Sequence, residues 1–276
     1  MKIGLKLFFI SFIFLSFCFA AIRYFQCTYA IDYNTGFYFS DSGLLGKSLY
    51  VLIAFILIYF FIITFIAKAV KADVFKKRMG QASDSLCAET GIVILICGIS
   101  YIYEMISVFS EGFDIFKLIY LFIGALGLVL AGLELFSKKR ITFKSGFFII
   151  MPAVMYVLRA INIFMHNLVI INISDELIRL LIDLSLGLFY FALGRMFIRS
   201  ETKYSRFKVC FIGFFALTLI VGEALGKAVY LAMHAESVRR NLDHMQIVLP
   251  NLGFIMDGGV VFAVLLHLLR KGREKV

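Results

Sequence analysis

Seven ionisable side chains interrupt otherwise apolar segments of this 276-residue chain. Each falls in the outer half of a segment that is predicted to span a membrane. A charge in hydrocarbon costs several kcal/mol unless it is paired or faces a water-filled cavity, so a shared depth favours one polar site over unrelated substitutions. The seven residues are Glu104, Arg159, Arg179, Asp183, Glu223, Lys227 and Asp257.

The spacing of these residues places several of them on common helix faces. Glu223, Lys227, Tyr230 and His234 follow steps of four, three and four, which is the period of one face of an α-helix. We therefore predict one polar layer built by five helices. Its candidate ligand-binding residues are Glu104, Arg159, Asp183, Glu223, Lys227 and Asp257, supported by Arg179, Tyr156, Asn162 and Tyr230.

The charges of this layer nearly balance, with four acids against three bases. A small polar or zwitterionic solute would suit such a layer better than a strongly charged one. The alternative is structural, because Glu223–Lys227 and Arg179–Asp183 are both spaced to close their own ion pairs. Gly222 and Gly226 form a GxxxG pattern beside Glu223, which predicts a neighbouring helix packed closely there.

Composition places the chain among polytopic membrane proteins. Its mean hydropathy is +0.94, and 62% of its residues are hydrophobic against 17% charged. Runs of about 20 apolar residues are long enough to cross hydrocarbon, and their length excludes the alternating strands of a barrel. We predict an all-α transmembrane bundle of eight helices, in one integral membrane domain covering 1–276, near 7–25, 48–67, 87–109, 118–137, 145–165, 177–197, 209–233 and 251–269.

The distribution of Lys and Arg predicts the orientation. With both termini in the cytoplasm, 20 of the 28 basic residues fall at the inner face, five at the outer face and three within helices. This bias accounts for the net charge of +10 and argues against nucleic-acid binding, which needs a basic face on a folded domain. The first apolar run could alternatively be a signal peptide cleaved after Ala20, which would leave seven helices.

The predicted segments indicate two classes of function. One is a small-solute transporter or solute-binding membrane component, and the other is a sensor, assembly or accessory protein that works with a partner membrane protein. The sequence contains no HExxH pattern or short histidine pair, so we predict no metal site, no cofactor and no catalytic residue. Enzyme activity is the minority interpretation.

A short motif follows the first predicted helix. Arg23-Tyr24-Phe25-Gln26 and the later run from Asp32 to Phe37 resemble a pattern in uncharacterised multi-pass membrane proteins of Clostridia-type bacteria. The resemblance covers about fifteen residues. It implies a multi-pass protein of the bacterial cell membrane, and it implies no activity.

Overall fold

The structure is a computed structural model that describes residues 5–31, 43–69, 84–111, 114–138, 141–166, 174–198, 205–235 and 251–269. Each of the eight predicted helices is present among these residues. They are α1 (Leu5–Tyr29), α2 (Gly43–Ala69), α3 (Asp84–Glu111), α4 (Ile115–Lys138), α5 (Phe143–His166), α6 (Ser174–Phe197), α7 (Ser205–Met233) and α10 (Leu252–Leu269). The prediction of an all-α bundle is confirmed.

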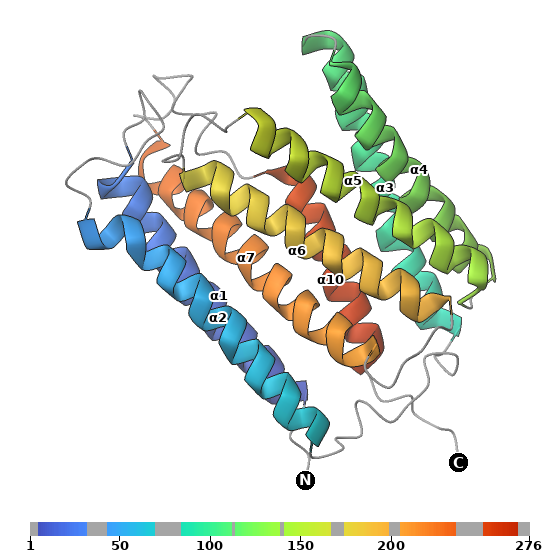
Figure 1. Cartoon of the computed structure of the whole chain (residues 1–276), viewed down its shortest axis with the longest axis horizontal. Helices are drawn as coiled ribbons and strands as arrows, with labels where there is room; N and C mark the ends of the chain where they lie inside the picture. Colours follow the sequence, from blue (N-terminus) through green and yellow to red (C-terminus); the bar gives the residue numbers. More distant parts are fainter. Residues whose placement is uncertain are drawn as a thin grey trace.

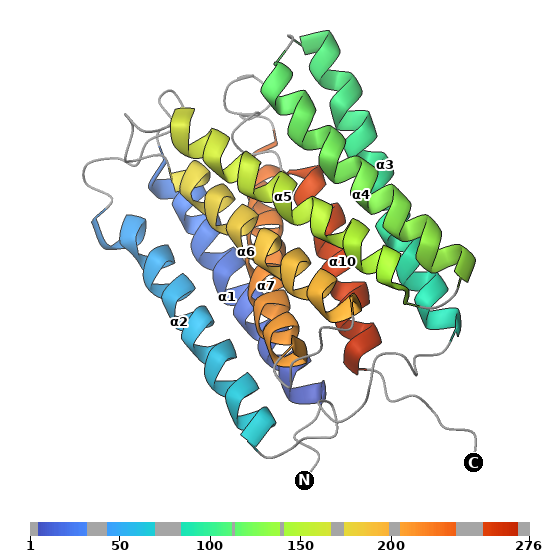
Figure 2. The ribbon, with the colours of Figure 1, turned by 45° about the vertical axis from the view of Figure 1, so that its right-hand side comes forward.

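The helices have the length and composition of membrane spans. Seven of the described helices, α1 to α7, are long and apolar enough to cross a bilayer, and α10 contributes a shorter apolar stretch, Leu252–Leu268. The first turn of α1 and the last turn of α10 lie at the same end of the bundle (Figure 1, Figure 2). This arrangement agrees with an even number of crossings, as predicted from the basic residues. We call the opposite end the outer end, following that prediction.

Six helices form a closed ring. Each of α3, α4, α5, α6, α7 and α10 packs against the next in that order, and α10 packs back against α3. Figure 2 shows α10 between α7 and α3, behind α5 and α6. Residues that point inward from these helices therefore meet across the ring, far from their neighbours in the sequence.

Helices α1 and α2 pack outside the ring against α7 (Figure 1). The GxxxG pattern makes the close contact that the sequence predicts. A Cβ atom on Gly222 would lie 2.5 Å from Phe19 Cδ1, and one on Gly226 would lie 2.7 Å from Arg23 Cβ. Only glycine fits at these two positions, so α1 is a tightly packed part of the bundle.

The outer surface of the bundle is apolar. Helix α2 illustrates this, because Val51, Phe55, Ile58 and Phe65 are all more than half exposed. Apolar side chains of this size remain exposed on a helix that is surrounded by lipid, where the backbone is satisfied internally. The chain is therefore a multi-pass membrane protein whose helices contact the bilayer.

Candidate functional site

A buried charged triad joins α1 to α7. Arg23 Nε lies 2.8 Å from Glu223 Oε2, and Lys227 Nζ lies 3.0 Å from Glu223 Oε1. The Arg23 side chain is fully buried, and Lys227 is only 4% exposed. Arg23 Nη1 also donates to Gln26 Oε1, and Gln26 Nε2 donates to the carbonyl oxygen of Leu45 on α2. The predicted Glu223–Lys227 pair is confirmed, but it is one half of a three-charge cluster.

Arg23 is a residue of this site that the sequence pattern does not identify. It is one of the five basic residues assigned to the outer face, because it lies near the predicted end of the first helix. In the structure α1 continues to Tyr29, so Arg23 lies inside the helix and faces α7. The signal that could have identified it is the pair of glycines at 222 and 226, which allows the α1 backbone to approach Glu223 closely.

A second ion pair links α5 to α6. Arg159 Nε lies 3.3 Å from Asp183 Oδ2, and the Arg159 guanidinium carbon lies 4.7 Å from the centre of the Phe254 ring on α10. Asp183 is fully buried and Arg159 is 8% exposed. The alternative in which Asp183 pairs with Arg179, which their spacing allows, is not the arrangement in the structure. Arg179 pairs with Glu176 at 3.2 Å, because Asp183 faces the ring interior while Arg179 lies nearer the surface.

The third cluster surrounds Asp257 with neutral hydrogen-bond donors. Tyr101 donates to Asp257 Oδ2, Tyr190 donates to Oδ1 at 3.0 Å, and the Cys97 thiol lies 3.4 Å from Oδ1. Tyr156 Oη lies 2.7 Å from Tyr101 Oη. Because a tyrosine hydroxyl has one proton and Tyr101 donates its proton to Asp257, Tyr156 must donate to Tyr101. These donors come from α3, α5 and α6. The hydrogen bonds around Asp257 therefore connect α10 to α3 and α6, and through Tyr101 to Tyr156 on α5.

Replacing Tyr101 with phenylalanine is expected to lower the free energy of unfolding by about 1.5–3 kcal/mol, since it removes a hydrogen bond to a charged acceptor and strands Tyr156. Unfolding of the purified protein in detergent measures this loss. Tyr103→Phe is the matched control, because Tyr103 lies on the same helix and is 75% exposed. Equal stability of the two variants would contradict the role of Tyr101.

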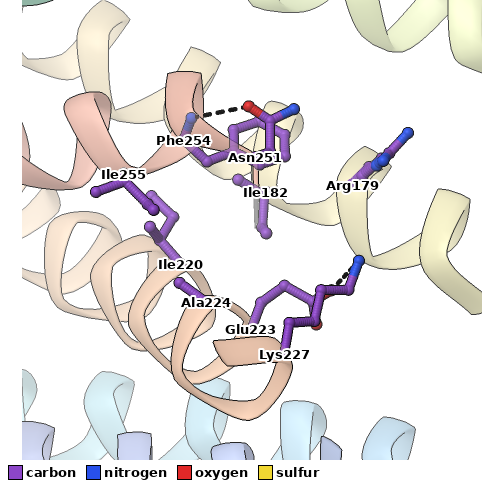
Figure 3. Close-up of a pocket in the computed structure, with 9 residues that line it drawn as sticks. All are labelled: Arg179, Ile182, Ile220, Glu223, Ala224, Lys227, Asn251, Phe254 and Ile255. Carbon is purple, nitrogen blue, oxygen red and sulfur yellow. Dashed lines mark hydrogen bonds and ion pairs between the residues drawn. The ribbon is translucent and has the colours of Figure 1, made fainter. Parts of the chain in front are cut away.

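A pocket opens between α6, α7 and α10 (Figure 3). It has an empty volume of about 330 Å³, including the part that is open to the surroundings. Two cations, Arg179 and Lys227, line it together with the Glu223 carboxylate. Asn251, which caps α10 by accepting a hydrogen bond from the Phe254 backbone N–H, lines the pocket as well. The rest of its wall is apolar and is formed by Ile182, Ile220, Ala224, Phe254 and Ile255.

The predicted single polar layer is divided in two. Glu223 and Lys227 lie on the α1 and pocket side of α7, whereas Arg159, Asp183 and Asp257 lie inside the ring. Phe254 lies between the two parts, since it lines the pocket and the Arg159 guanidinium lies over its ring. The sequence could not distinguish these sides because the helices cross the layer at similar depths.

The remaining predicted residues lie at the edges of these clusters. The Glu104 side chain is half-buried on α3, and its Oε2 would lie 3.8 Å from a Cβ atom on Gly253. Tyr156 stacks on Tyr190 with ring centres 5.8 Å apart. Tyr230 stacks on His234 at the end of α7, and Asn162 lies one turn beyond Arg159 on α5.

The structure offers no cluster for a metal ion among the described residues, in which no group of three or more His, Cys, Asp or Glu side chains converges. No family model, curated protein or solved structure matches the chain. The functional argument therefore rests on the pocket and on the charged clusters.

Proposed function

We propose that the chain is a bacterial cell-membrane protein that binds a small polar or zwitterionic solute from the outer side, as a transporter or as a solute-binding membrane component. The pocket between α6, α7 and α10 carries this proposal, because it joins charged side chains to an apolar wall. Small-molecule sites are typically concave and apolar, with a few polar groups that orient the ligand.

The charges around the pocket favour a solute with an anionic group. Two bases, Arg179 and Lys227, line it with one acid, Glu223. Behind them Glu176 pairs with Arg179 and Arg23 pairs with Glu223, so the excess stays at one positive charge. A carboxylate or phosphate on the solute would balance the extra positive charge. Arg179 is suited to bind it, because its guanidinium forms paired hydrogen bonds with such groups and its side chain is still 35% exposed.

Replacing Arg179 with glutamine is expected to weaken solute binding by about 10- to 100-fold, which corresponds to one charged hydrogen bond. Uptake of metabolites by cells with and without the protein identifies the candidate solutes. A thermal-shift panel of carboxylic acids, amino acids and phosphate esters then gives their affinities for the purified protein.

The matched control is Arg195→Gln, which makes the same change on the same helix at the inner end, where Arg195 lies 5.8 Å from the Phe191 ring centre. It should leave solute binding unchanged. Unaltered binding by Arg179→Gln would reject the anion-binding role of the pocket.

A second candidate function is that of an assembly or accessory protein whose polar layer is structural. The closed triad of Arg23, Glu223 and Lys227 favours it, because every charge there has a partner within the chain. In that case Arg179→Gln should leave the cellular phenotype intact, and capture of the protein from membranes should recover a partner membrane protein in stable proportion.

A further inference from the structure

The ring interior contains more negative than positive charge. Among the residues that the structure describes there, the Asp183 carboxylate interacts electrostatically with the carboxylates of Glu104 and Asp257, and the Arg159 guanidinium interacts with Asp183 and Glu104. Tyr120 of α4 also faces this group. Arg179 acts on Asp183 from the same helix, but its charge is balanced by Glu176. The interior therefore carries two more negative than positive side-chain charges.

The three carboxylates differ in how they are stabilised. Asp257 accepts hydrogen bonds from two tyrosines and a thiol, and Glu104 is only half-buried. Asp183 is fully buried, and the ion pair that it forms with a described residue joins its Oδ2 to Arg159 Nε. Within the described part of the chain, Asp183 Oδ1 has no hydrogen-bond partner.

A buried carboxylate oxygen without a donor is costly, and more so beside other negative charges. The cost disappears if a small cation occupies the position beside Oδ1. A divalent metal ion is usually held by several charged ligands, and no group of three or more His, Cys, Asp or Glu side chains converges among the described residues. One carboxylate oxygen instead suits a small monovalent cation, which is either a proton or a sodium ion whose other ligands are neutral oxygens.

We propose that the ring interior is a binding site for one small monovalent cation, either sodium or a proton, at Asp183 Oδ1. In the proton form, the Asp183 carboxylate takes up a proton from water and becomes a neutral acid, and no other bond changes. In the sodium form, the ion stays beside the charged carboxylate. Either form leaves one excess negative charge in the interior. This site is separate from the solute pocket, which lies on the other side of Phe254.

The test is the midpoint temperature of unfolding, Tm, of the purified protein. It is measured in sodium chloride against choline chloride at constant ionic strength, and separately across pH 5 to 8. A ligand that binds only the folded state raises Tm by about 5 °C at a concentration 100-fold above its Kd. A rise with sodium identifies the metal ion. A rise as pH falls identifies the proton, because the folded protein then binds that proton more tightly than the unfolded chain.

Three variants locate the site. Asp183→Asn should abolish the response. Glu104→Gln changes a half-buried position that tolerates the substitution. It should raise the sodium concentration that gives a half-maximal rise in Tm about tenfold, or lower the pH that gives it by about one unit, because one nearby negative charge is lost. Glu176→Gln should keep the full response, since Glu176 pairs with Arg179 outside the interior.

The proposal is overturned if Tm responds to neither cation, or if all variants respond as the intact protein does. Should Asp183→Asn fail to fold, the Glu104→Gln response decides alone. None of these measurements requires a solute, so the solute-binding proposal stands or falls separately.

Discussion

Replacing Glu223 with glutamine is expected to remove most of the folded protein from the membrane. The change leaves two buried cations, Arg23 and Lys227, without the carboxylate that lies 2.8 Å from one and 3.0 Å from the other. Removing one partner of a buried ion pair costs about 3–5 kcal/mol, which is a large share of the stability of a folded protein. Membrane abundance and the Tm of the purified protein both measure the loss.

The triad predicts an order among its single variants. Lys227→Met should be much milder than Glu223→Gln, because Arg23 and Glu223 still pair after the lysine is removed. Glu176→Gln is the matched control, since it removes a carboxylate from the partly exposed Arg179 pair and should cost less than about 1 kcal/mol. If Lys227→Met proved as damaging as Glu223→Gln, Arg23 would not be the stronger partner of Glu223.

The triad also changes how a compensating variant must be designed. The spacing of Glu223 and Lys227 suggests that removing both charges would restore folding. In the structure that double variant leaves Arg23 buried without its carboxylate. Folding should recover only when Arg23 is also made neutral, for example as Arg23→Gln, which keeps a donor near Gln26.

The sequence predicts the helices because the hydrocarbon of a bilayer allows little else. Long apolar runs must form helices whose backbone groups pair internally, and all eight were found. Their ends are less well predicted. Helix α2 begins at Gly43 and α1 ends at Tyr29, whereas hydropathy gives 48 and 25, since helices extend into the more polar layer where apolar content no longer marks them.

The contacts of the site are only partly predictable. Spacing along one helix identifies the Glu223–Lys227 pair, because both members lie one turn apart. It also allows a pair between Arg179 and Asp183, whereas Asp183 pairs with Arg159 on α5. The choice depends on the rotation of α6 about its axis, which is set by packing against α5 and α7. The Arg23–Glu223 contact joins residues 200 positions apart, so no local pattern contains it.

Replacing Arg159 with alanine is expected to destabilise the protein about as strongly as Glu223→Gln. The change removes the ion pair with Arg159 from the fully buried Asp183, in an interior that already holds Glu104 and Asp257. The expected cost is again about 3–5 kcal/mol, measured as membrane abundance and as Tm in detergent. Arg159→Lys should be milder, because it keeps the charge but loses the planar contact with Phe254.

Two further variants show whether the charge itself is responsible for this loss. Combining Arg159→Gln with Asp183→Asn should restore much of the stability, since it removes both charges and leaves groups of similar size. Arg195→Ala is the matched control, because Arg195 also lies over an aromatic ring but on an exposed part of α6, so its loss should cost about 1 kcal/mol or less. If Arg159→Ala were as stable as Arg195→Ala, the interior would not be organised around this guanidinium. If the paired variant stayed as unstable as Arg159→Ala, the loss would come from packing against Phe254 and not from the stranded carboxylate.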